Sequence, residues 1–142
     1  MASNRGYSIL VTEDIISSGS AILCYIMRSG SLPAATEFVT PPDATLQVGY
    51  IVHPRGHEIA RHMHRPQERL IIGTAEVLLV QRGRCEMDFY DNNRHLVATR
   101  ELRAGDIVVL LDGGHGFRML EDTVLLEIKQ GPYPGLVEKE NF

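Results

Sequence analysis

Apolar residues in this chain come in short runs separated by turn residues, and almost none of these runs has helical periodicity. Residues 46–53 and 85–90 alternate apolar and polar positions with a period of two, which predicts strands. The polar turn at 91–94 predicts that 95–102 returns as the hairpin partner of 85–90. The apolar runs at 107–111 and 124–128 predict two further strands. Strands at such short spacing are typical of a β-sandwich or barrel, not of parallel βαβ units.

Two of the apolar runs, 77–80 and 107–111, are apolar on both faces. A strand in a sandwich needs only its inner face apolar, so something must cover the outer face of these two. The N-terminal segment, roughly residues 7–45, and a second copy of the chain would both give this pattern. We expect a homodimer with some coverage from the N-terminal segment.

The length of 142 residues, with 44% hydrophobic and 23% charged residues, predicts one soluble globular domain. A net charge of -4 offers no basic patch for nucleic acid, and no apolar run approaches the roughly 20 residues of a membrane helix. The first residues lack the layout of a secretion signal. Cys24 and Cys85 are too few for a disulfide framework, so we expect two buried thiols and a reducing, cytoplasmic location.

Four side chains suggest a metal site. His62 and His64 would share one face of a strand, about 7 Å apart at the backbone. Glu76 opens another predicted strand, and His115 follows two glycines at the start of a separate one. Three imidazoles and a carboxylate suffice for a divalent transition metal (Fe, Mn, Ni, Co or Zn) and leave one or two positions open for a ligand.

These positions also carry a resemblance to a known family. The first motif of the cupins is similar to Gly56-x5-His62-x-His64 followed by Glu76-x6-Gly83, and the second to Gly105-x5-Leu111-Asp112-Gly113-Gly114-His115. The resemblance implies an all-β double-stranded β-helix (a jelly-roll barrel), often dimeric, with a metal bound by His62, His64, Glu76 and His115. The single domain, 1–142, would then comprise an N-terminal β extension (1–45), the barrel core (46–130) and a C-terminal tail (131–142).

The chain departs from the family's pattern in both motifs. The family has three or four residues between its second histidine and the glutamate, whereas eleven separate His64 from Glu76. Glu68 sits near the shorter spacing and competes for the role, but no glycine follows it at the required six-residue gap. Glu76 is therefore the preferred ligand. The second motif has Leu111 in place of proline, is one residue short before His115, and has Met119 in place of asparagine.

Several other residues have two readings. Glu58 shares the strand phase of His62 and His64 and is either a surface residue or an acid beside the metal ligands. Glu127 and Lys129 form either an outward-facing ion pair or part of a cavity wall. The tail after Gly131 would lie across one end of the barrel or against a neighbouring subunit. Spacing supports no Ser-His-Asp or Cys-His nucleophile, and no catalytic residue is assigned.

The leading functional hypothesis is a metal-dependent cupin enzyme that acts on a small polar organic substrate by oxygenase, isomerase or lyase chemistry. One alternative is a non-catalytic module that binds or senses a small ligand, since the fold alone does not decide function. Another is a metal-free cupin similar to the sugar-nucleotide epimerases and ketoisomerases. In all three, the expected partners are a small molecule and a second copy of the chain.

Overall fold

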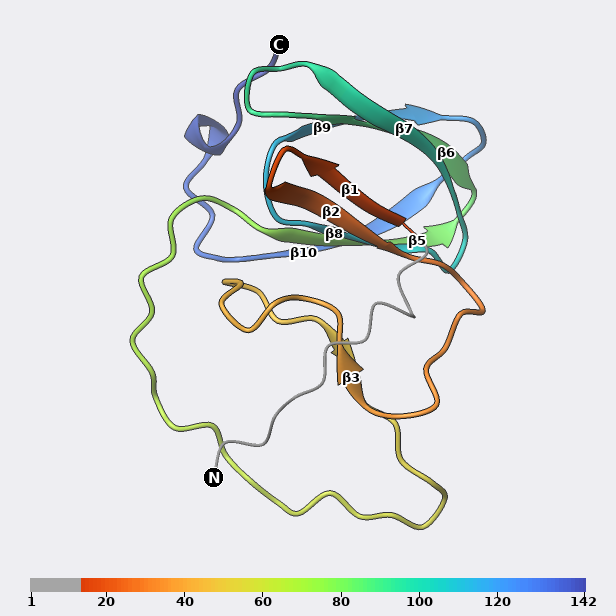
Figure 1. Ribbon diagram of the computed structural model, residues 1–142, viewed down its shortest axis with the longest axis vertical. Helices are drawn as coiled ribbons and strands as arrows, with labels where there is room; N and C mark the ends of the chain where they lie inside the picture. Colours follow the sequence, from red (N-terminus) through yellow and green to blue (C-terminus); the bar gives the residue numbers. More distant parts are fainter. Residues whose placement is uncertain (1–13) are drawn as a thin grey trace.

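Strands and loops make up almost all of the computed structural model, which describes residues 14–142 (Figure 1). The strands are β1 (Asp14–Ser18), β2 (Ala21–Met27), β3 (Glu37–Phe38), β4 (Gly49–Tyr50), β5 (Glu76–Arg82), β6 (Arg84–Tyr90), β7 (Leu96–Arg103), β8 (Ile107–Leu110), β9 (Gly114–Met119) and β10 (Val124–Lys129). The helical content of this part of the chain is one 3-10 turn, η1 (Leu136–Glu138). The all-β prediction is confirmed. No helix within residues 14–142 has the length and apolar character that a membrane crossing requires.

The strands form two main antiparallel sheets and a small ribbon. The larger sheet has the order β1-β2-β8-β5-β10, the smaller one the order β7-β6-β9, and β3 pairs with β4. Each order ends in edge strands, so the hydrogen bonds of residues 14–142 do not close a barrel. Strands β9 and β10, consecutive in the chain, are both edges, one in each main sheet.

Local pattern predicted most of these strands. The expected hairpin is β6 and β7, paired from Arg84↔Arg103 to Tyr90↔Leu96. In its turn, the Asp91 carboxylate accepts hydrogen bonds from the backbone N–H groups of Asn93 (2.8 Å) and His95 (3.0 Å). The runs at 107–111 and 124–128 are also strands, as predicted. The strand expected over 46–53 is much shorter, because only Gly49 and Tyr50 find a partner, in β3.

Alternating residues of the two main sheets face each other and form the core. From β6 these are Cys85, Met87 and Phe89, each at most 1% exposed. They lie in one apolar cluster with Leu78 and Val108 of the larger sheet. Burial is also the largest cause that raises the pKa of the Cys85 thiol. Cys24 is buried and free as well, so the prediction of two buried thiols is confirmed.

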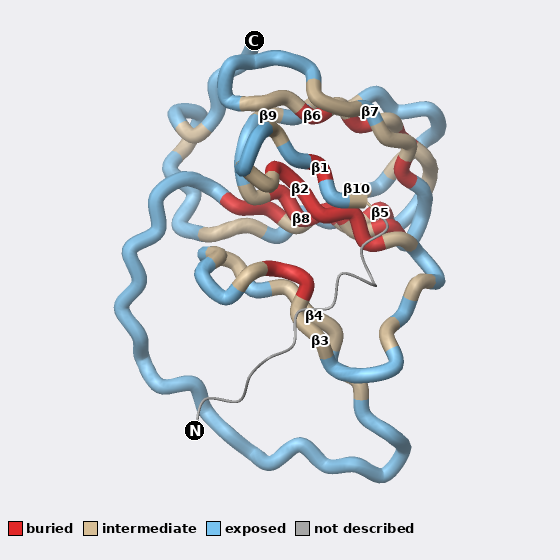
Figure 2. Tube along the Cα trace, viewed as in Figure 1, coloured by how far each residue is buried: buried red, intermediate tan, exposed pale blue. Residues whose placement is uncertain are grey.

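A second cluster covers the outer face of the larger sheet. Val39, Val48 and Tyr50, from the region of β3 and β4, pack on a group that includes Val77 and Val109. These last two belong to the doubly apolar runs, so the chain itself covers them (Figure 2). Within the expected segment 7–45, Val39 contributes to this cover, whereas Val48 and Tyr50 lie beyond residue 45; residues 7–13 lie outside the described part. The doubly apolar strands therefore no longer require a second copy of the chain.

A long exposed loop joins β4 to β5. All residues from 53 to 74 are exposed, and the loop swings away from the sheets before it returns at Ala75 (Figures 1 and 2). One backbone–backbone hydrogen bond forms between residues 53 and 73, from His57 N–H to the Pro54 carbonyl (3.2 Å). We call residues 51–74 the long loop.

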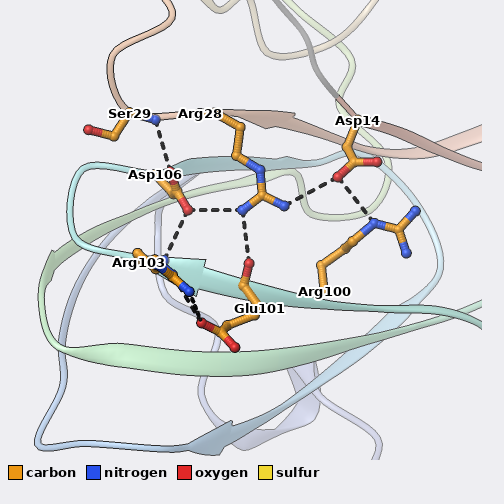
Figure 3. A network of polar contacts seen from close by, with 7 residues as sticks. All are labelled: Asp14, Arg28, Ser29, Arg100, Glu101, Arg103 and Asp106. Carbon is orange, nitrogen blue, oxygen red and sulfur yellow. Dashed lines mark hydrogen bonds and ion pairs between the residues drawn. The ribbon is translucent and has the colours of Figure 1, made fainter.

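A buried polar network ties the two main sheets together at one end (Figure 3). The Asp106 carboxylate accepts hydrogen bonds from the backbone N–H of Ser29 (2.9 Å) and of Arg103 (2.9 Å), and from Arg28 Nη1 (3.0 Å). Arg28 also donates to the Glu101 carbonyl of β7 (2.8 Å) and to Asp14 Oδ2 (3.2 Å). Because Arg28 follows β2 and Arg103 ends β7, Asp106 joins strands of both sheets.

We expect Asp106→Asn to lower the free energy of unfolding by about 2–4 kcal/mol, because an amide nitrogen would face donors that the carboxylate now satisfies. Chemical denaturation measures the change. The matched control is Asp122→Asn at an exposed turn, with an expected change of about 0.5 kcal/mol or less. Equal effects of the two substitutions would contradict the role given to the Asp106 network.

Candidate functional site

A cavity of about 560 Å³ opens at the end of the main sheets where β5 begins. This volume lies within the range of small-molecule sites. Strands β5, β9 and β10 contribute to its wall, together with the C-terminal tail. Five acids dominate the polar lining: Glu76, Asp112, Glu127, Glu138 and Glu140. The apolar lining includes Leu110, Phe117 and Phe142.

Glu76 and His115 meet in this cavity. Glu76 is the first residue of β5 and is 7% exposed. Its Oε2 atom lies 3.5 Å from His115 Nε2, is fully buried, and has no hydrogen-bond partner among residues 14–142. A buried carboxylate oxygen without a donor is costly, so the site calls for a cation or a hydrogen-bond donor.

The surroundings of His115 favour its neutral form. The His115 side chain is 30% exposed, yet desolvation is the largest influence and lowers the pKa of the imidazole. In decreasing order, Glu76 raises this pKa, Lys139 lowers it and Glu127 raises it. The Phe117 ring lies edge-on at 5.8 Å between centroids. A neutral imidazole has a free ring nitrogen that can bind a metal or accept a proton.

The backbone just before His115 is held in a conformation that only glycine adopts easily. Gly113 has φ +74°, and a Cβ atom built there would lie 2.2 Å from the Tyr90 carbonyl oxygen. This close approach brings the start of β9 beside β6, where His115 pairs with Phe89. The two glycines before His115 therefore aim its ring into the cavity.

The C-terminal tail forms part of the cavity wall. Glu138 accepts hydrogen bonds from Lys129 Nζ (3.2 Å) and Thr74 Oγ1 (3.1 Å). Arg94 Nη2 donates to Glu140 (2.7 Å). The final residue, Phe142, packs edge-on against Tyr90 with 5.1 Å between ring centroids.

The cavity also resolves the two readings of Glu127 and Lys129. Glu127 lines the cavity, and Lys129 Nζ lies 3.8 Å from its carboxylate. The hydrogen bond to Glu138 is the largest cause that raises the pKa of Lys129. Glu127 thus belongs to the cavity wall, and Lys129 lies beside it.

The two remaining predicted ligands lie elsewhere. His62 and His64 are exposed on the long loop, with 5.4 Å between their ring centroids, and His62 Nδ1 lies 2.9 Å from the Ala60 carbonyl oxygen. The expected strand at this position is wrong, because the loop has no neighbouring strand to pair with. Glu58 and Glu68 are exposed on the same loop, so neither lines the cavity.

The structure therefore assembles half of the expected metal site. Glu76 and His115 come together, which favours Glu76 over Glu68 at this position. Within residues 14–142 no group of three or more His, Cys, Asp or Glu residues is placed to hold a metal ion. Sequence reasoning missed the acids of the tail, Glu138 and Glu140, because their irregular segment has no periodicity that indicates what it covers.

Comparisons of this chain with protein-family models, with curated proteins and with solved structures find no match. The residues and their geometry thus carry the functional argument.

We expect Gly113→Ala to lower the free energy of unfolding by more than about 1 kcal/mol, since alanine disfavours a positive φ and its methyl group meets the Tyr90 carbonyl. Thermal or chemical unfolding tests this. Gly116→Ala, three residues later in β9, is the control, because a Cβ there meets nothing within 4 Å and no left-handed φ is required. A Gly113→Ala protein as stable as the control would contradict this role.

Proposed function

We propose that this protein is a cupin-like metal-binding enzyme, and that the cavity around Glu76 and His115 is its active site for a small polar organic molecule. The observation that carries the proposal is the buried Glu76 Oε2 atom, which has no donor and faces His115 Nε2 at 3.5 Å. A bound cation or a donor group of a substrate would relieve this cost.

The donor types fit a first-row divalent ion such as Fe, Mn, Ni, Co or Zn. Glu76 offers a carboxylate oxygen and His115 a neutral imidazole nitrogen, both of which bind such ions. Two donors are too few for a stable site, and His62 and His64 are the proposed additional ligands. Such an ion, when bound, acts as a Lewis acid toward substrate oxygen atoms.

Other residues of the cavity suit a small polar molecule. Lys139 and Glu127 line the wall and offer a cation and an anion to orient a substrate. Phe117 and Phe142 supply apolar contact area. The tail, held by Glu138 and Glu140, contributes to the wall. In the proposed jelly-roll fold, the two main sheets are the two halves of the barrel.

A second candidate is a metal-free isomerase or epimerase, favoured by the pairing of Glu76 and His115 without a third donor nearby. In that mechanism the Glu76 carboxylate, which lies beside Nε2, orients the ring and stabilises its charged form, and the imidazole takes or delivers the substrate proton at Nδ1. Turnover that survives complete removal of metal by a chelator would favour this candidate over the first.

We expect the wild-type protein to bind about one cobalt(II) ion per chain, and His115→Ala and Glu76→Gln to weaken this binding more than about 10-fold. Equilibrium dialysis with metal analysis measures the change. His95→Ala is the control, since His95 is exposed at the hairpin turn and pairs with Asp91. A wild-type protein without cobalt affinity, or an equal loss in the control, would overturn the metal proposal.

A further inference from the structure

We propose that the cavity is completed by a second copy of this chain, whose long loop docks at the open edges of β9 and β10 and supplies His62 and His64 to Glu76 and His115. This inference rests on the proposed function for the metal. The docking itself rests on the exposed loop, the open sheet edges and the charges of the two surfaces.

Large apolar side chains on the long loop are exposed to solvent. Met63 is 92% exposed, Leu70 87% and Ile72 85%; Ile51 and Ile59 are also exposed. Several large apolar residues in one exposed segment mark an interaction surface. Within residues 14–142, the backbone between residues 53 and 73 makes only the turn bond at His57 and the contact of the Ala60 carbonyl with His62 Nδ1.

The unpaired sheet edges to which this loop could add border the cavity. Strands β9 and β10 are edges, with one row of backbone groups unpaired by any strand of residues 14–142. His115 of β9 and Glu127 of β10 both line the cavity. On the outer side of β10, Leu126 and Ile128 are exposed. An extended segment that adds to such an edge satisfies both sets of backbone groups.

Strand alternation would present the correct side chains. If residues 58–65 extend along an edge, His62 and His64 share one face, and Ile59 and Met63 share the other. With the histidines toward the cavity, the apolar pair faces outward, on the side where β10 exposes Leu126 and Ile128. One orientation thus brings these apolar side chains together and delivers two metal donors.

Charge also matches the two surfaces. The long loop carries four arginines and two glutamates: Arg55, Arg61, Arg65, Arg69, Glu58 and Glu68. The cavity lining carries five acids against Lys139, with Lys129 nearby. A basic loop and an acidic cavity attract each other and orient the encounter.

The following features favour the loop of a second copy over the chain's own loop at this cavity. Both ends of the loop are anchored: the Val52 N–H donates to Thr36 Oγ1 (2.8 Å), and the Ala75 N–H donates to Gln130 Oε1 (2.8 Å). Between these anchors the loop extends away from its own sheets (Figure 1). In a two-fold dimer each copy offers one loop and one cavity, so the same exchange occurs twice.

Mixed dimers test the origin of the histidines. One chain carries His62→Ala and His64→Ala, the other Glu76→Gln and His115→Ala, and dimers with two different affinity tags are purified after co-expression. We expect little cobalt(II) in either variant alone and about one cobalt per mixed dimer, half the wild-type content, because one of its two sites has all four ligands. Circular dichroism checks that each variant is folded.

The outcomes separate this inference from the proposed function. A cobalt-free wild-type protein defeats the metal proposal. A wild-type protein that binds cobalt, with mixed dimers that bind none or with no dimer at all, defeats the exchange and indicates closure of the loop within its own chain. Recovery of cobalt in the mixed dimer supports it.

A metal-independent measurement tests the docking surface. We expect Ile59→Asp with Leu70→Asp to weaken dimerisation at least about 10-fold in sedimentation experiments without metal. Leu32→Asp, at an exposed leucine outside the long loop, is the control and leaves the dimer unchanged. A monomeric wild type, or a dimer that tolerates both loop substitutions, would overturn the docking.

Discussion

Met87 and Phe89 of β6 pack against Leu78 of β5 and Val108 of β8, and this contact between the inner faces of the two main sheets places the rest of the molecule. Asp106 joins strands of the same two sheets through backbone and arginine donors, so apolar packing and polar bonds fix one arrangement. The cavity forms where the sheets separate beyond this core. Glu76, His115 and Glu127 stand on strands β5, β9 and β10, which favours precise binding geometry.

The cavity combines features that would be unfavourable in an apolar core. Glu76 is buried without a donor for Oε2, and four further acids line the same space. A buried carboxylate oxygen without a donor, in a cavity lined by acids, points to a binding site. The tail contributes to the wall of this space and is held there by polar contacts of Glu138 and Glu140.

The long loop is the main departure from a self-contained domain. Its large apolar residues are exposed to solvent, and β9 and β10 leave two sheet edges unpaired beside an acidic cavity. Exchange of the loop between two copies would cover the apolar residues and pair the sheet edges. Val39 and Tyr50 cover the doubly apolar strands within the chain, so these strands do not call for a dimer. The exposed long loop is the feature that favours one.

By itself the sequence determined what depends on local chemistry: the all-β class, the hairpin of β6 and β7, the buried cysteines, and Glu76 and His115 as candidate ligands. Turn residues and period-two alternation specify such features within a few residues. Tertiary structure decided which edge each strand meets. The alternating pattern at 46–53 therefore became only a two-residue strand. The loop with His62 and His64 stayed apart from the cavity. Tertiary structure also placed Glu138 and Phe142 in the wall of the cavity. Alternation shows which face of a segment is apolar, but not which distant surface that face will meet.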